Sequence, residues 1–392
     1  MHDLIIKNIN AVLQNGVLEK TSVAISSGRI TAIGDEEAVA EQVIDGCGGF
    51  LFPGFIDVHV HGGGGADFMD ATPEAFETAA RAHLAYGTTT LVPTAMSASE
   101  EELSDFLRAY GLFRAKSSYA SIAPYGVHFE GPYFAGASGK SRGAQKADAL
   151  RPIDLDEVER LLALADGSLL RWDAAPELEK SDAFARRLTA AGVTVAVGHS
   201  RATAEETAKG YAAGFSHVTH FYNACTMYEK RDQVVTAGTV EATYLADDVT
   251  VELIADGKHI PRYCLLLALK IKGEDKVLGI TDATRLAGTD AERGFLGSLT
   301  KGTEVIVEDG VAKLPDRTSF AGSICTMARA LRVLCVDYGI SPTVAAKMLS
   351  TNPARRIGAE EIGAIEIGKI ADLVLTDDAF SVKTVFKNGI KV

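Results

Sequence analysis

The sequence predicts an α/β fold, in which a TIM-like (β/α)8 barrel carries a small β-sandwich domain built from both ends of the chain. Short apolar runs alternate with helix-like stretches through the middle of the chain, and eight such runs can be counted. Both ends are rich in β-forming residues instead. With 392 residues, 47% of them hydrophobic, the chain can bury one large core and a second, smaller module.

The terminal module is predicted from two β-rich segments with similar turns. Residues 1–52 contain short β-forming runs and the hairpin signal Asn15-Gly16. Residues 356–392 repeat this texture, with Asn388-Gly389 as the second hairpin signal. We therefore expect the two segments to form one small sheet domain beside the barrel.

The barrel is predicted over residues 53–355, with a β insertion near residues 294–319. Helical periodicity between the strands is clearest at residues 73–86, 181–191 and 203–213. The candidate strands are residues 54–61, 88–94, 123–131, 168–177, 193–200, 217–224, 249–257 and 276–284. Eight parallel strands are the number that closes a barrel of this kind.

Composition limits the cellular compartments and the classes of binding partner that we expect. A formal net charge of −13 disfavours nonspecific binding to nucleic acid or to an anionic membrane, so an anionic substrate would need a local basic pocket. The five cysteines are odd in number and form no C-x-x-C pair, which indicates reduced thiols. The N-terminus has no secretion-signal pattern, and no apolar run is long enough to cross a bilayer. We expect a soluble cytoplasmic protein.

Metal-type side chains recur where predicted strands end. His59 and His61 lie two residues apart in one strand and therefore project to the same side. Barrel enzymes place their active sites at the C-terminal ends of the strands. Four further strands end in the same way, with Glu130, His199, His220 and Asp282. Imidazole and carboxylate ligands without thiolate suit a reactive zinc, iron, manganese or cobalt ion better than a structural zinc.

This ligand set predicts metal-assisted hydrolysis. A bound divalent ion lowers the pKa of water and polarises a substrate carbonyl. Asp282 could then take the proton of the attacking water and return it to the departing amine. His128, two residues before Glu130, faces the same way and is either a supporting residue or ordinary packing.

Motifs along nearly the whole chain resemble the N-acetylglucosamine-6-phosphate deacetylases of the amidohydrolase superfamily. PGFIDVHVHG (53–62) and GKIADLVL (368–375) are shared across the superfamily. The more specific motifs are HFEGP (128–132), VGHS (197–200), HFYNA (220–224), IADGKH (254–259), ITDA (280–283), FAGS (320–323) and TNPAR (351–355). The resemblance implies hydrolysis of N-acetyl-D-glucosamine 6-phosphate to D-glucosamine 6-phosphate and acetate in amino-sugar catabolism, by a homodimer.

The resemblance also implies roles for individual residues. Glu130, His199 and His220 would hold the principal metal, zinc or iron, with Asp282 as the catalytic acid and base. His59 and His61 match a pair that supports a second metal in some members, so one or two ions are expected. The residues implied to bind the sugar phosphate are Asn223, Ala224, Arg231 and His259. Those implied to line the sugar are Ala144, Asp256, Phe320, Ala321 and Gly322.

One position departs from the family pattern. Some members have a histidine that polarises the acetyl carbonyl, where the RGAQ segment here offers Gln145. Its amide can donate a hydrogen bond but carries no full charge, so the developing oxyanion would rely more on the metal.

Three alternatives stay open. An N-acetylgalactosamine-6-phosphate deacetylase would differ only in the epimer that it accepts. A cyclic-amide hydrolase usually bridges two metals with a carboxylated lysine of the fourth strand, but residues 168–177 contain no lysine. A barrel that had lost catalysis would be expected to have lost ligands, whereas Glu130, His199, His220 and Asp282 are all present.

Overall fold

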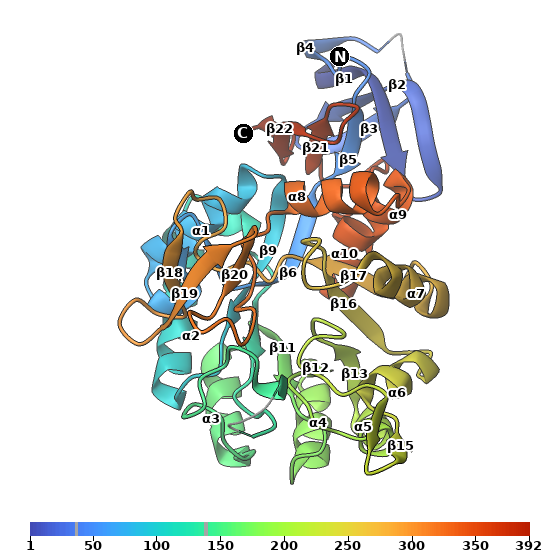
Figure 1. Ribbon diagram of the computed structural model, residues 1–392. Coiled ribbons are helices and arrows are strands. Elements are labelled where there is room, and N and C mark those ends of the chain that lie inside the picture. Colours follow the sequence, from blue (N-terminus) through green and yellow to red (C-terminus); the bar gives the residue numbers. More distant parts are fainter. Residues whose placement is uncertain (36–37, 137–139) are drawn as a thin grey trace.

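The computed structural model describes residues 1–35, 38–136 and 140–392, and leaves out the side chains of Lys140 and Arg231. A β-rich lobe that holds both termini sits above a larger lobe of strands and helices (Figure 1). No described helix is long and apolar enough to cross a membrane. The five cysteines are all described and all free.

The larger lobe is the predicted parallel barrel. Its strands follow one another in space in their order along the chain, from β6 to β17. Strands β17 and β6 meet through a parallel bridge between Val60 and Ala283, and the Asp282 amide donates to the His59 carbonyl oxygen at 3.0 Å. The strands are β6 (Phe55–Val60), β9 (Thr88–Ala95), β10 (Val127–Glu130), β11 (Leu169–Ala174), β12 (Thr194–Val197), β13 (Phe215–Val218), β16 (Thr250–Ile254) and β17 (Val277–Ile280). The fold class predicted from the sequence is thus confirmed.

Helices cover the outside of the barrel because each presents an apolar stripe to it. Capping boxes start α2 and α5, at Ser99 with Glu102 and at Thr203 with Glu206. The helices are α1 (Pro73–Leu84), α2 (Glu100–Lys116), α3 (Leu155–Ala165), α4 (Ser181–Ala190), α5 (Ala204–Ala213), α6 (Thr239–Leu245), α7 (Arg262–Lys272), α8 (Met327–Arg332), α9 (Pro342–Ala346) and α10 (Asn352–Arg356). Helices α8 to α10 lie between the barrel and the upper lobe (Figure 1).

The upper lobe is one sheet made from both ends of the chain. Strand β21 lies between β22 and β5, and pairs antiparallel with β5 through Leu373 and Pro53. Asn388-Gly389 forms the turn of the β22–β23 hairpin. The β1–β2 hairpin turns at Gln14-Asn15, one residue before the predicted Asn15-Gly16, and Gly16 already pairs with Leu13. Its strands are β1 (His2–Leu13), β2 (Gly16–Ser26), β3 (Arg29–Ile33), β4 (Ala40–Asp45), β5 (Phe50–Pro53), β21 (Leu373–Thr376), β22 (Val382–Lys387) and β23 (Ile390–Lys391). The domain limits of residues 1–52 and 356–392 stay a prediction.

Smaller sheets stand beside the mouth of the barrel. A three-stranded antiparallel sheet comprises β18 (Arg293–Leu296), β19 (Thr303–Glu308) and β20 (Val311–Lys313), where the sequence predicts an insertion. Leu296 and Val305 of this sheet pack with Met96, which follows β9. Two further pairs are β7 (Gly62–Gly63) with β8 (Ala66–Asp67), and β14 (Glu229–Arg231) with β15 (Val234–Thr236). The insertion therefore builds one wall beside the strand ends.

Candidate functional site

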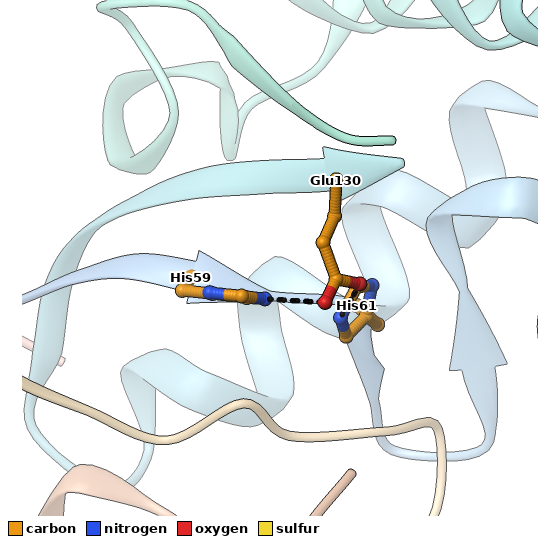
Figure 2. A group of neighbouring side chains, drawn as sticks. All are labelled: His59, His61 and Glu130. Carbon is orange, nitrogen blue, oxygen red and sulfur yellow. Dashed lines mark ion pairs between the residues drawn. The ribbon is translucent and has the colours of Figure 1, made fainter. Parts of the chain in front are cut away.

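Six side chains from five strand ends converge at the C-terminal mouth of the barrel, as the sequence predicts. They are His59 in β6, His61 directly after β6, Glu130 in β10, His199 after β12, His220 after β13 and Asp282 after β17. Each is at most 7% exposed. Figure 2 shows His59 and His61 approaching the carboxylate of Glu130.

Glu130 is the centre of this cluster. Its Oε1 lies 2.9 Å from His199 Nε2 and 3.0 Å from His220 Nε2. The Nε2 atoms of the other pair are also near, with His61 at 3.4 Å from Oε2 and His59 at 3.9 Å from Oε1. Two sets of three donor atoms thus lie within 4.8 Å of one another, His59–His61–Glu130 and Glu130–His199–His220. One carboxylate can serve both sets.

Local backbone geometry turns three of these side chains inward. His199, His220 and Asp282 have φ values of 45°, 26° and 50°, in the left-handed region that residues other than glycine seldom adopt. Each lies just after its strand, so the turn replaces strand alternation as the means of directing the side chain. Such conformations cost roughly 1–3 kcal/mol each and cluster at functional sites.

Donor atoms without partners show that the cluster fits a cation. The carboxylate of Glu252 accepts from His59 Nδ1 at 3.1 Å, and the Ser141 carbonyl accepts from His199 Nδ1 at 2.8 Å. A neutral imidazole that donates through Nδ1 presents a lone pair on Nε2. The buried His59 Nε2 has no hydrogen-bond partner among the described residues and faces an oxygen of Asp282 at 3.6 Å. Lone pairs and carboxylates that converge in this way suit a divalent ion with N and O ligands.

The pKa values in the cluster show that its carboxylates favour positive charge at this position, as a cation site requires. Burial lowers the pKa of His61, but the hydrogen bond to Asp282 and the charges of Glu130 and Asp282 outweigh it and raise the pKa to about 9. His220 behaves in the same way beside Glu130, with a pKa of about 9. Burial also opposes ionisation of Asp282, yet the hydrogen bond from His61 and the charge of that imidazole hold the pKa of Asp282 below the usual value. Asp282 is therefore a carboxylate at neutral pH.

A pocket opens over this cluster, and most of the predicted substrate residues line it. Those lining it are Ala144, Gln145, Asn223, Ala224, His259, Phe320 and Gly322. Asp256 lies behind His259 and accepts from its Nδ1 at 2.8 Å. Ala321 is fully buried in the core under the insertion. Arg231 ends strand β14, but its side chain lies outside the described residues.

Gln145 uses its amide to hold Glu130. Its Nε2 donates to Glu130 Oε2 at 2.8 Å, and its Oε1 accepts from the Ser97 amide at 3.1 Å. A primary amide carries two hydrogens, and the second hydrogen of Gln145 has no acceptor in the hydrogen bonds of the described residues. The contact with Glu130 was not expected from the sequence, which suggested only contact with the acetyl carbonyl.

A buried layer of charges below the cluster was missed by the sequence reasoning. Arg171 of β11 and Glu252 of β16 form an ion pair in the barrel interior. The carboxylate oxygens of Asp173 lie 2.8 Å from His128 Nε2 and 3.1 Å from Arg171 Nε, at ion-pair distance. His128 therefore belongs to this layer. The available signal was the presence of charged residues in the middle of apolar strand segments, which is costly unless they are paired.

Comparison with known proteins decides the family. The amidohydrolase family model matches residues 50–392. The chain belongs to the amidohydrolase family. The family implies a divalent metal, and the Glu130-centred cluster of this amidohydrolase has side chains that could hold one.

Curated relatives and solved structures cover nearly the whole amidohydrolase chain. It is 32% identical to N-acetylglucosamine-6-phosphate deacetylase of Lysinibacillus sphaericus, over 98% of this chain and 97% of the relative. It is 30% identical to N-acetylgalactosamine-6-phosphate deacetylase of Escherichia coli O157:H7, over 96% of both. The N-acetylglucosamine-6-phosphate deacetylase of Pasteurella multocida superposes with a TM-score of 0.90 at 28% identity, over 99% of both chains. The resemblance predicted from the motifs is confirmed.

Proposed function

We propose that this amidohydrolase hydrolyses the acetamide bond of N-acetyl-D-glucosamine 6-phosphate and releases D-glucosamine 6-phosphate and acetate. The observation that carries the proposal is the Glu130-centred cluster, with Asp282 beside it at the floor of the pocket. Near full-length likeness to deacetylases of this substrate supports it. A place in amino-sugar catabolism follows from the two products.

Zinc or iron is the proposed metal. Glu130, His199 and His220 would hold the principal ion, and Glu130 with His59 and His61 a second. A bound divalent ion lowers the pKa of water and polarises the acetyl carbonyl. Gln145 keeps the shared carboxylate of Glu130 in place through its amide.

Asp282 is the proposed proton carrier. Its carboxylate is ionised and buried, and its Oδ1 lies 3.1 Å from His61 Nε2 at the pocket floor. It takes a proton from water as the water oxygen bonds to the acetyl carbon. It then gives that proton to the sugar nitrogen as the carbon–nitrogen bond breaks. The second proton of the water leaves on the new carboxyl group, which ionises to acetate when the products separate at neutral pH.

The far side of the pocket is the proposed phosphate end. Asn223, Ala224 and His259 line it. Because Asp256 accepts from His259 Nδ1, the ring's Nε2 is directed away from Asp256 and is available to the ligand. Backbone amides, an imidazole and the guanidinium of Arg231 would bind an anion on an otherwise acidic protein.

We further propose that the enzyme works as a homodimer in the cytoplasm. Exposed apolar side chains at hairpin β14–β15 support association of two copies, with Tyr228 and Val234 each 64% exposed. The free cysteines fit a reducing compartment. Sedimentation of the purified protein tests the dimer, and a monomer at micromolar concentration would contradict it.

An acetate-release assay on both epimeric sugar phosphates tests the function. The metal-stripped protein, reloaded with Zn²⁺ or Fe²⁺, is expected to release acetate from N-acetyl-D-glucosamine 6-phosphate. The likeness to an N-acetylgalactosamine-6-phosphate deacetylase makes that epimer the second candidate substrate. A higher kcat/KM for the galacto epimer would replace the proposal with this alternative, and no release from either would reject both.

A further inference from the structure

Glu252 lies next to the Glu130-centred cluster and, among the described residues, contacts it only through His59. This fully buried carboxylate lies in the middle of β16. Its Oε2 is 3.1 Å from His59 Nδ1 and accepts from Thr219 Oγ1 at 3.1 Å. Glu252 thus reaches His59 but no other member of the cluster in the hydrogen bonds and ion pairs of the described residues.

The other oxygen of Glu252 is fixed from below. Oε1 forms an ion pair with Arg171 and lies 3.3 Å from His217 Nε2. Arg171 is itself held by Asp173 at 3.1 Å. A buried carboxylate held by an arginine, a hydroxyl and two imidazoles has little freedom to rotate.

This arrangement decides which nitrogen of His59 faces the cluster. His59 Nδ1 lies 3.1 Å from Glu252 Oε2 and 3.3 Å from Arg171 Nη2. The nearer partner is an ionised carboxylate, which only accepts hydrogen bonds and therefore favours the proton on Nδ1. The lone pair then sits on Nε2, which points at Glu130 and Asp282 and has no hydrogen-bond partner in the part of the chain that the structure describes. If Glu252 were lost, Nδ1 would face the guanidinium of Arg171 at 3.3 Å, and the ring would favour the opposite tautomer.

We propose that Glu252, clamped by Arg171, is the positioning residue that holds His59 ready to bind the second metal ion, next to His61 and Glu130. The ion held by Glu130, His199 and His220 does not depend on it, because neither histidine contacts Glu252. The inference rests on the proposed function only in assuming that the cluster binds metal.

Metal titration of the stripped protein tests this role without any sugar. Zn²⁺ bound per chain is measured by equilibrium dialysis and elemental analysis, for the wild type and for Glu252→Gln. The wild type is expected to bind two ions. Glu252→Gln is expected to retain the tighter site and to bind the second ion about 10- to 100-fold more weakly, the usual effect of removing a carboxylate that orients a ligating histidine.

Two further variants separate positioning from folding. Thr219→Val removes only the hydroxyl that contacts both Glu252 and His59, so it should lower the affinity for the second ion, but by less than Glu252→Gln does. If Glu252→Gln does not fold, Thr219→Val takes its place in the test. Glu157→Gln removes a buried carboxylate of another arginine pair, with Arg151 and Tyr133, outside the cluster, and should leave both ions unchanged.

Wild-type affinity for both ions in the folded Glu252 variant, or in Thr219→Val where it stands in, would overturn the inference. A single ion in the wild type would overturn it as well. Two ions in the wild type without acetate release would instead reject the proposed function and leave the positioning role intact.

Discussion

At the scale of single residues, the candidate metal ligands are held in place by supporting contacts from distant parts of the chain. His59, His61, Glu130, His199 and His220 were identified because their chemistry is unusual at strand ends and their places repeat. The contact of Gln145 with Glu130 could not be foreseen, because it joins residues 15 positions apart across a loop with no periodicity. The same holds for the Arg171–Glu252 pair, which joins two strands, β11 and β16, that are not neighbours in the barrel.

Asp282→Asn tests the proton carrier. The amide keeps the shape of the side chain and can still accept from His61 through its oxygen, but it cannot take a proton. We expect kcat to fall by about 10²- to 10⁴-fold with the bound metal unchanged. The measurements are acetate release and metal content on the same preparation. Near-normal turnover would remove Asp282 from the mechanism.

Asp256→Asn tests the phosphate end of the pocket. The change weakens the contact that orients His259, so KM for the phosphorylated sugar should rise about tenfold while kcat changes little. Arg231→Ala is expected to act in the same way. Steady-state kinetics with N-acetylglucosamine as the unphosphorylated comparison provide the check, and an equal effect on both sugars would contradict the assignment.

At the scale of elements, apolar runs located every barrel strand but misplaced some ends. Residues 217–224 were predicted as a strand, whereas β13 is Phe215–Val218 and His220 lies in the turn that follows. The polar Ser216 interrupts the apolar run, so the sequence pattern places the start of the strand too late. The turn that follows β13 has the sequence HFYN (220–223), in which polar and aromatic residues resemble the alternation of a strand. Ends are therefore least predictable where strand and site meet.

The turn after His61 requires glycine at position 62. A Cβ added to Gly62 would lie 2.2 Å from the Ala66 carbonyl oxygen, in a segment fixed by the bond from the His61 amide to the Ala283 carbonyl at 2.8 Å. We expect Gly62→Ala to destabilise the protein by about 1–3 kcal/mol, measured as a lower Tm and urea midpoint.

Gly111 provides the matched control for that substitution. It lies exposed in helix α2 with no heavy atom within 4 Å of an added Cβ. Gly111→Ala should therefore stabilise the protein by about 0.5–1 kcal/mol. Similar changes in Tm for both variants would show that backbone crowding at Gly62 is not the cause.

For the whole molecule, metal-free stability is expected to fall as pH rises from about 6.5 to 9. The pKa values of His61 and His220 are raised from 6.5 to about 9, so the stability they contribute is complete below 6.5 and is lost through 9. The lowered pKa values of His128, about 3, and His217, about 4, matter only at more acidic pH.

Metal should reverse this trend, because a bound ion replaces the protons on both histidines. Zn²⁺ affinity is expected to increase over the same pH range. Thermal unfolding at several pH values, with chelator and with Zn²⁺, measures both effects. A chelated protein whose Tm rises between pH 6.5 and 9 would contradict the assigned protonation states.

The joining of β21 to β5 has a consequence for biosynthesis. Pro53 of β5 pairs with Leu373 of β21, which is synthesised much later. Until then, the edge of β5 that pairs with β21 is open. Contacts so distant in sequence form late, and open strand edges invite aggregation. A nascent chain that stops within the barrel would keep this edge exposed to chaperones and proteases. An unpaired edge of β5 would therefore distinguish an incomplete chain from the folded protein.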